Sequence, residues 1–313
     1  MPAEPTQSTA HVVMIRPANF ASNPETIASN RFQTAAADRD PAGIQRAAQA
    51  EFDALVDALA TAGVEVHVFE DTPAPLKPDA VFPNNWFSTH RNGIVVLYPM
   101  LAPNRRLERR LDIIESLHAR DGFHVHATVD MTGRELEDKF LEGTGSLVLD
   151  RTHRIAYACL SPRTDLDVLG EFGQRLDYDI AAFDAADANG APIYHTNVLM
   201  SVGTRFAAVC SAAIEESRRA AIVTLLETTG HTIVDLSFEQ MHAFAGNMLE
   251  LRTREGGVVI AMSETALRSL NAAQRATLES CGAIVAVPIP TIERLGGGSV
   301  RCMIAEIFLQ QQP

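Results

Sequence analysis

The order strand, tight turn, strand, helix, strand recurs four times along the chain. The tight turns mark it most clearly, and they are "RNG" (91–93), "RTH" (151–153), "VGT" (202–204) and "REGG" (254–257). They recur at roughly fifty to sixty residues, within or just beyond the interval read as an internal repeat. A fifth unit is complete only if "GGGSVRCMIAEIF" at the end joins "HVVMIRP" at the start. We therefore predict an α/β ring of five like modules.

Short stretches rich in Val and Ile, separated by turn residues, are the expected strands. Amphipathic segments between them predict helices, most clearly at 44–61, where Ala48, Phe52, Leu55 and Leu59 share one face. Similar patterns occur near 105–119, 165–176, 212–229 and 263–280. No linker or shift in composition divides the chain. We expect a frayed, disordered tail at 1–10 and a single domain over 11–313.

The overall charge limits the classes of partner. The net charge is −13, with 46% hydrophobic and 21% charged residues. This excludes nucleic acid as an expected partner, because phosphates need a basic footprint, and it disfavours an anionic membrane surface. No apolar run reaches the ~18 residues of a membrane span, and the start has neither a basic nor an apolar signal region. The expected location is the cytoplasm.

The four cysteines lie far apart, at 159, 210, 281 and 302, without a C-x-x-C pair. This pattern indicates free thiols in a reducing compartment and no structural zinc site. The "HVH" at 124–126 resembles a metal pair, but no third ligand is evident, so we interpret it as a strand with both histidines on one side.

The first strand of each module should direct residues towards the centre of the ring. These stretches are "PDAVFPNNWFSTH" (78–90), "LEGTGSLV" (141–148), "YHTNVLM" (194–200), "AGNMLEL" (245–251) and "GGGSVRC" (296–302). Together they offer a carboxylate, Glu142, an imidazole, His195, and a thiol, Cys302. A thiol with a proton-moving group and a carboxylate is the set that nucleophilic catalysis requires.

These stretches resemble the arginine deiminase and amidinotransferase superfamily, the pentein or α/β-propeller fold with five ββαβ-type modules around a pseudo-fivefold axis. The branch most similar is that of the citrulline-utilisation hydrolases. The resemblance runs from "VVMIRP" to "GGGSVRCMIAEIF". It implies that Cys302 is the nucleophile and that His195 and Glu142 are its catalytic partners.

Each of these residues also has a structural interpretation. A buried cysteine is more often a small hydrophobic residue than a nucleophile, and we assign Cys159 and Cys210 to that class. The glycine run before Cys302 and the superfamily pattern favour catalysis there. The place of His195 in the third module favours a catalytic role over a structural one. Glu142 could otherwise be a loop carboxylate.

The resemblance also implies substrate-binding residues. Arg105 in "PNRRLE" and Arg163 in "LSPRTD" match segments that hold a substrate carboxylate, for which the planar arginine fork is suited. The alternative for either arginine is a solvated surface position. Asn84 in "VFPNNW" matches an asparagine near the α-carbon end of the substrate, or else belongs to a turn.

The chain departs from relatives that act on guanidines, which place carboxylates where this sequence has His90 and Asn197. An uncharged ureido group needs no buried carboxylate opposite it, and Asn and neutral His can hydrogen-bond it. We therefore expect a hydrolase of the ureido C–N bond of citrulline. The alternatives are an arginine deiminase, a dimethylarginine hydrolase, an amidinotransferase, or a catalytically silent binding propeller. We expect a small amino-acid substrate, no metal and no cofactor, and leave the assembly open, with a homodimer among the options.

Overall fold

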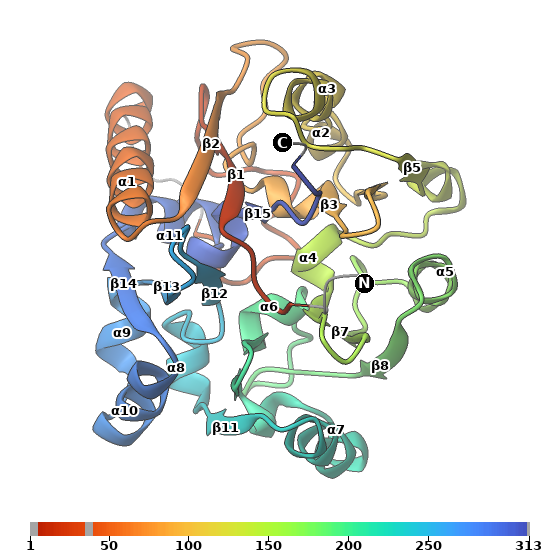
Figure 1. Ribbon diagram of the computed structural model, residues 1–313, viewed down its shortest axis with the longest axis vertical. Coiled ribbons are helices and arrows are strands. Elements are labelled where there is room, and N and C mark those ends of the chain that lie inside the picture. The colour runs from red at the N-terminus through yellow and green to blue at the C-terminus, as the bar shows by residue number, and fades with distance from the viewer. Residues whose placement is uncertain (1–5, 35–39, 312–313) are drawn as a thin grey trace.

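The computed structural model describes residues 6–34 and 40–311. Within them, five small sheets of three strands each are arranged around a common centre, and the longer helices lie at the periphery (Figure 1). This is the α/β ring of five like modules that the repeat predicts.

Each sheet belongs to one module, and its middle strand is antiparallel to the first strand and parallel to the third. Four sheets are made of consecutive strands: β3 (Phe87–Thr89), β4 (Ile94–Leu97) and β5 (Ala127–Asp130); β6 (Val148–Asp150), β7 (Ile155–Cys159) and β8 (Asp179–Phe183); β9 (Met200–Val202), β10 (Phe206–Val209) and β11 (Thr232–Asp235); β12 (Leu249–Arg252), β13 (Val258–Ser263) and β14 (Ala283–Val287).

The fifth sheet is assembled from the two ends of the chain. Its strands are β15 (Ala305–Glu306), β1 (His11–Arg16) and β2 (Glu65–Glu70), in that order. Val12 of β1 pairs with Glu306 of β15, and His11 pairs with Glu65 of β2. The predicted sharing of one module by the N- and C-terminal segments is confirmed.

Helices connect the second and third strands of the modules. A parallel pair needs such a crossover connection, whereas the antiparallel pairs of the four sheets made of consecutive strands are joined by the four predicted tight turns. The crossover segments contain α1 (Pro41–Thr61), α2 (Pro103–Arg106), α3 (Leu111–Ala119), α5 (Leu166–Leu176), η3 (Ser211–Ala213), α7 (Glu216–Thr228), α9 (Glu264–Ser269) and α10 (Ala272–Cys281), while the 3₁₀ turn η2 (Thr132–Glu137), α8 (Phe238–His242) and α11 (Pro290–Gly296) link modules.

The stretches predicted as the first strands begin instead with a helical turn. The turns are η1 (Pro83–Asn85), α4 (Gly143–Ser146), α6 (Thr196–Leu199) and η4 (Val300–Met303), and a strand follows each of them. Gly, Asn, Ser and Thr at these positions favour turns over extended backbone. The strands are therefore shorter than the sequence pattern suggests, and the candidate site residues lie on or beside the turns.

The start of the chain is ordered where the structure describes it. Gln7 is buried, donating to the main-chain oxygens of Leu149 and Val202 at 2.8 and 2.9 Å. Ser8 donates to Glu250 at 3.0 Å. The segment therefore joins three modules near the centre of the ring. The expectation of a frayed tail is wrong for residues 6–10, and residues 1–5 of that expectation lie outside the described part.

The hydrophobic core extends from module to module. One buried cluster contains Phe52 of α1, Met14 of β1 and Val259 of β13, together with Cys302. Packing across module boundaries supports the prediction of a single domain. No helix within residues 6–34 and 40–311 combines the length and apolar character that crossing a membrane requires.

Candidate active site

Cys302 lies on η4, directly after the glycine run. Gly297 ends α11 with a φ of 64°, a left-handed conformation that suits glycine. A Cβ on Gly298 would lie 3.1 Å from the Phe82 ring and 3.3 Å from Cβ of Cys302. The glycines therefore reverse the chain and let it pack closely against η1. Cys302 is only 4% exposed and lines a small pocket together with His195, Arg105 and Arg163.

His195 and Glu142 form a buried pair beside Cys302. Nε2 of His195 lies 2.8 Å from Oε2 of Glu142, and Oε1 of Glu142 accepts from the main-chain N of Leu101 at 3.0 Å. Both side chains precede a helical turn, α6 and α4 respectively. A Cβ on Gly145 would come within 2.7 Å of Nδ1 of His195, so this glycine makes room for the imidazole.

The pair has a clear charge state. Burial alone would raise the pKa of Glu142, but Arg163, His195 and Arg105 together hold it well below its usual range. Burial lowers the pKa of His195 to about 4, against the opposing effect of Glu142. At neutral pH, Glu142 is therefore ionised and His195 is neutral. Its Nε2–H donates to Glu142, which leaves the Nδ1 lone pair to accept a proton.

Two asparagine amides face the thiol. Nδ2 of Asn197 lies 3.4 Å from Sγ of Cys302, and Nδ2 of Asn247 lies 3.2 Å from the same sulfur. Oδ1 of each amide is buried without a hydrogen-bond partner among the described residues. Asn197 was predicted, whereas Asn247 was not. The only signal for Asn247 was its position in "AGNMLEL", at the centre-facing start of the fourth module.

Both predicted arginines reach the pocket but differ in how they are held. Nε and Nη2 of Arg105 each donate to Glu108 at 2.9 Å, so its fork is already engaged. Arg163 donates to Ser29 at 2.7 Å and lies 3.3 Å from Glu142. The solvated surface alternative is wrong for both, because each is nearly fully buried. All three guanidinium nitrogens of Arg163 donate, to Ser29, Glu142 and the main-chain oxygen of Thr26, and its contacts are mostly longer than those of Arg105.

Asp79 is a pocket residue that the sequence argument missed. It lies in the "PD" that opens the first centre-facing stretch, and its Oδ2 is 3.7 Å from Nε of Arg105. Burial raises its pKa, against the effects of Arg105 and Asn23. Its Oδ1 has no hydrogen-bond partner within the described chain. The pocket thus contains a first-module carboxylate, at a position other than the two, His90 and Asn197, where relatives that act on guanidines place theirs.

His90 does not line the pocket of Cys302. It bonds through Nε2 to Ser88 at 2.9 Å and lines a different pocket with Arg151 and Tyr178. Burial and then Arg151 and Arg154 lower its pKa well below the usual value. The proposed contact of His90 with the substrate head group is therefore wrong: His90 comes at the far end of β3, away from η1. Asn84 is on η1, fully buried, and its side-chain atoms have no hydrogen-bond partner among the residues described.

The other thiols differ from Cys302 in their surroundings. Burial raises the pKa of Cys159 to about 12 and that of Cys210 to about 11. Both lie in the apolar cluster between the second, third and fourth modules. Their expected role as core residues fits this packing.

Comparison with known protein families agrees with this arrangement. The profile of the family described as "N,N dimethylarginine dimethylhydrolase, eukaryotic" matches residues 16–309, which is nearly the whole chain. The chain belongs to this family. It is thus a member of the pentein superfamily of arginine-modifying hydrolases, and the prediction of a hydrolase acting on C–N bonds other than peptide bonds is confirmed. None of the curated proteins compared with it matches significantly.

Solved structures share the fold at low sequence identity. The N-terminal domain of ArgZ, an arginine dihydrolase from the ornithine–ammonia cycle in cyanobacteria, is 17% identical, with a TM-score of 0.69 over 96% of this chain and 99% of that domain. DDAH from Pseudomonas aeruginosa, complexed with citrulline, is 14% identical, with a TM-score of 0.64 over 96% of this chain and 99% of that one. AgrE, solved with ornithine and NAD+, is 16% identical, with a TM-score of 0.70 over 97% of this chain and 40% of that one.

Proposed function

We propose that this pentein hydrolase cleaves the ureido group of citrulline, with Cys302 as the nucleophile. The observation that carries the proposal is the pair of amides at the thiol. Asn197 and Asn247 each present an NH₂ donor to Sγ of Cys302 and an Oδ1 acceptor without a partner within the described residues. A ureido group offers one C=O acceptor and N–H donors, so it matches both atoms of each amide. A guanidinium offers donors alone.

The first chemical step forms a bond between Sγ of Cys302 and the ureido carbon. Nδ1 of His195 takes the thiol proton, and Glu142 stabilises the imidazolium that results. Electron density moves from the C=O bond to its oxygen, where the amide NH₂ groups can donate to the developing negative charge. Collapse then breaks one C–N bond, and His195 returns its proton to the departing nitrogen.

Hydrolysis completes the reaction. Neutral His195 removes a proton from a water molecule that attacks the carbon on Sγ, and the thiol is restored when the C–S bond breaks. The carbamate product loses carbon dioxide. In sum, citrulline and one water give ornithine, ammonia and carbon dioxide, and no oxidant or reductant is needed.

Arginine is the second candidate substrate, and Asp79 favours it. This buried carboxylate lines the pocket and has a free oxygen, which could pair with a guanidinium. Both cyanobacterial and pseudomonal structures that share the fold are named for enzymes of arginine or its methylated form.

The Asp79→Asn variant separates the two candidates. If citrulline is the substrate, the variant should keep a measurable turnover of citrulline, because the ureido group needs no counter-charge. If a guanidinium pairs with Asp79, the variant should lose arginine hydrolysis by about 100-fold or more, since a buried charge without its partner costs ~3–5 kcal/mol. Ornithine and ammonia should both be quantified, with Cys302→Ala as the inactive control.

A further inference from the structure

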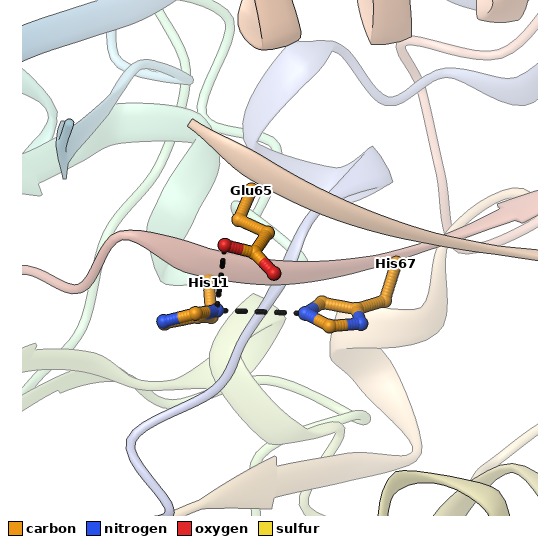
Figure 2. Close-up of side chains that lie close together, drawn as sticks. All are labelled: His11, Glu65 and His67. Carbon is orange, nitrogen blue, oxygen red and sulfur yellow. Dashed lines mark hydrogen bonds and ion pairs between the residues drawn. The ribbon is translucent and has the colours of Figure 1, made fainter. Parts of the chain in front are cut away.

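A second group of metal-ligand side chains lies outside the pocket of Cys302, on the sheet formed by the two ends of the chain. His11 is on β1, and Glu65 and His67 are on β2. One donor atom from each of the three lies within 4.8 Å of the others. Figure 2 shows the facing ring nitrogens of His11 and His67, with the Glu65 carboxylate beside them. We propose that this cluster binds a divalent transition metal ion of the Zn²⁺ class.

Strand geometry brings the three side chains together. His11 and Glu65 are direct partners in the parallel register of β1 and β2. Glu65 and His67 are two residues apart on one strand, so they share a face of the sheet. The parallel register and the alternation of side chains along β2 thus place all three side chains on the same face of the sheet. In the sequence, Glu65 and His67 form an E-x-H pattern and His11 lies more than fifty residues earlier. This spacing is too wide to indicate a metal site.

The distances fit a tetrahedral ion. Nδ1 of His11 and Nε2 of His67 are 3.5 Å apart, and Nδ1 of His11 is 3.8 Å from Oε2 of Glu65. Two nitrogens bound to tetrahedral zinc at its usual bond length lie about 3.3 Å from each other. Small side-chain rotations would close the remaining difference. Three protein ligands leave the fourth position for water, which can enter because the Glu65 side chain is 37% exposed.

The histidine His67 is held in the orientation that a ligand needs. Its Nδ1 lies 3.4 Å from Oδ2 of Asp121, which leaves Nε2 as the nitrogen with a lone pair. A carboxylate on the far nitrogen is the usual outer partner of a metal-bound histidine. Phe123 packs edge-on against both imidazoles and restricts their rotation. Arg120 pairs with Asp121 and fixes the carboxylate in turn.

A second cluster shows what a group without this capacity looks like. Asp150, His153 and His231 also lie within ligand distance of one another. Nδ1 and Nε2 of His231, however, each face a main-chain oxygen at 3.1 Å, those of Leu226 and Gly203. Both ring nitrogens of His231 therefore already have main-chain partners, and an ion could bind only by displacing one of them. This cluster serves as a matched comparison.

The test is metal binding by the intact chain, measured by calorimetric titration with Zn²⁺ and by the absorption spectrum of the Co²⁺ form. We expect one equivalent of Zn²⁺ bound by the wild type, and visible Co²⁺ bands typical of a tetrahedral nitrogen and oxygen site without a thiolate charge-transfer band. His67→Gln and His11→Gln should each abolish this binding. Asp121→Asn keeps all three ligands and should weaken the affinity by about 10- to 100-fold.

Two controls locate the ion. Cys302→Ser should leave the stoichiometry and affinity unchanged, because the pocket thiol and His195 are not the ligands. His153→Gln should also leave them unchanged. Absence of stoichiometric binding in the wild type would overturn the proposal, as would binding of unchanged affinity in His67→Gln or His11→Gln, or loss of binding in Cys302→Ser. Circular dichroism of each variant distinguishes a lost ligand from a lost fold.

Discussion

Nδ2 of Asn247 lies 3.2 Å from Sγ of Cys302 and donates to the main-chain oxygen of Asn197 at 2.9 Å. The carbonyl fixes the orientation of the amide, because the flipped form would set two oxygens against each other. The NH₂ group of Asn247 must therefore face the sulfur. A fourth-module residue thus positions a donor at Cys302, the proposed nucleophile from the fifth module.

Asn247→Ala should lower kcat by about 100-fold, the usual loss when one donor at a developing charge is removed. The thiolate of Cys302 would lose a hydrogen bond, so alkylation by iodoacetamide should require a higher pH than in the wild type. Asn247→Asp is the isosteric control and should move the alkylation profile further, because a carboxylate repels the thiolate. An unchanged alkylation profile in both variants would show that Asn247 does not act on the thiol.

Cys302 should be the first cysteine to react with iodoacetamide, with loss of activity in step with its labelling. The burial that raises the pKa of Cys159 to about 12 and of Cys210 to about 11 keeps their reactive thiolate fractions very small. Mass spectrometry of the labelled peptides measures the order. Cys281→Ser, at a partly exposed helix end, should retain full activity. Full activity in Cys302→Ala would refute the mechanism.

The buried imidazole predicts a pH dependence of stability. The pKa of His195 is lowered from 6.5 to about 4 on folding, so the unfolded chain binds the proton first as pH falls. The contribution of His195 to stability is present above pH 6.5 and is lost towards pH 4, by about 3 kcal/mol in total. In urea denaturation, the free energy of unfolding of the wild type should fall relative to that of His195→Gln as the pH is lowered from 6.5 to 4.

The comparison isolates His195 because Asp79 and Glu108 remain in both proteins. Burial raises the pKa of these carboxyl groups, so their own contributions have the opposite slope. The matched control is His153→Gln, which changes a histidine with a 40% exposed side chain. It should follow the wild-type curve. Parallel curves for the wild type and His195→Gln would mean that His195 does not resist protonation.

Arg163 should control recognition of the substrate carboxylate. Arg163→Lys replaces a planar fork with a point charge, so KM for a carboxylated substrate should rise by about 10- to 100-fold. A decarboxylated analogue should be unaffected, and the preference between the two should disappear. Arg275→Lys, at an exposed arginine paired with Glu279, is the control. A retained preference in Arg163→Lys would assign carboxylate binding to another group.

Much of the ring was predictable because its signals are local and repeated. Tight turns and Val-rich strands follow from short-range patterns, and the same order in each module fixes the topology. The predicted first strands extend too far, because apolar residues such as Val198 and Leu147 continue the strand-like pattern through the helical turns that Asn and Gly favour.

The sequence predicts those candidate site residues that are identified by residue type and module position. It does not predict those whose place in the pocket depends on packing. Cys302, His195 and Glu142 stand out by residue type and module position. Whether His90 or Asp79 reaches the pocket depends on where η1 ends and β3 begins, which a one-sequence pattern does not specify. Asn247 was passed over because an asparagine before a strand usually marks only a turn. Gln7 could not be anticipated, since its partners are main-chain oxygens of distant modules.

The most direct test of the account is the ratio of kcat/KM for citrulline to that for arginine, with ornithine and ammonia measured in the same assay. Arginine would set a guanidinium N–H against the amide NH₂ group of Asn197, leaving a buried donor unpaired at a cost of ~1–3 kcal/mol. At ~1.4 kcal/mol per tenfold, the predicted preference for citrulline is about 5- to 100-fold. Hydrolysis of arginine as fast as citrulline, or faster, would contradict it and make the guanidinium the substrate group that Asp79 binds.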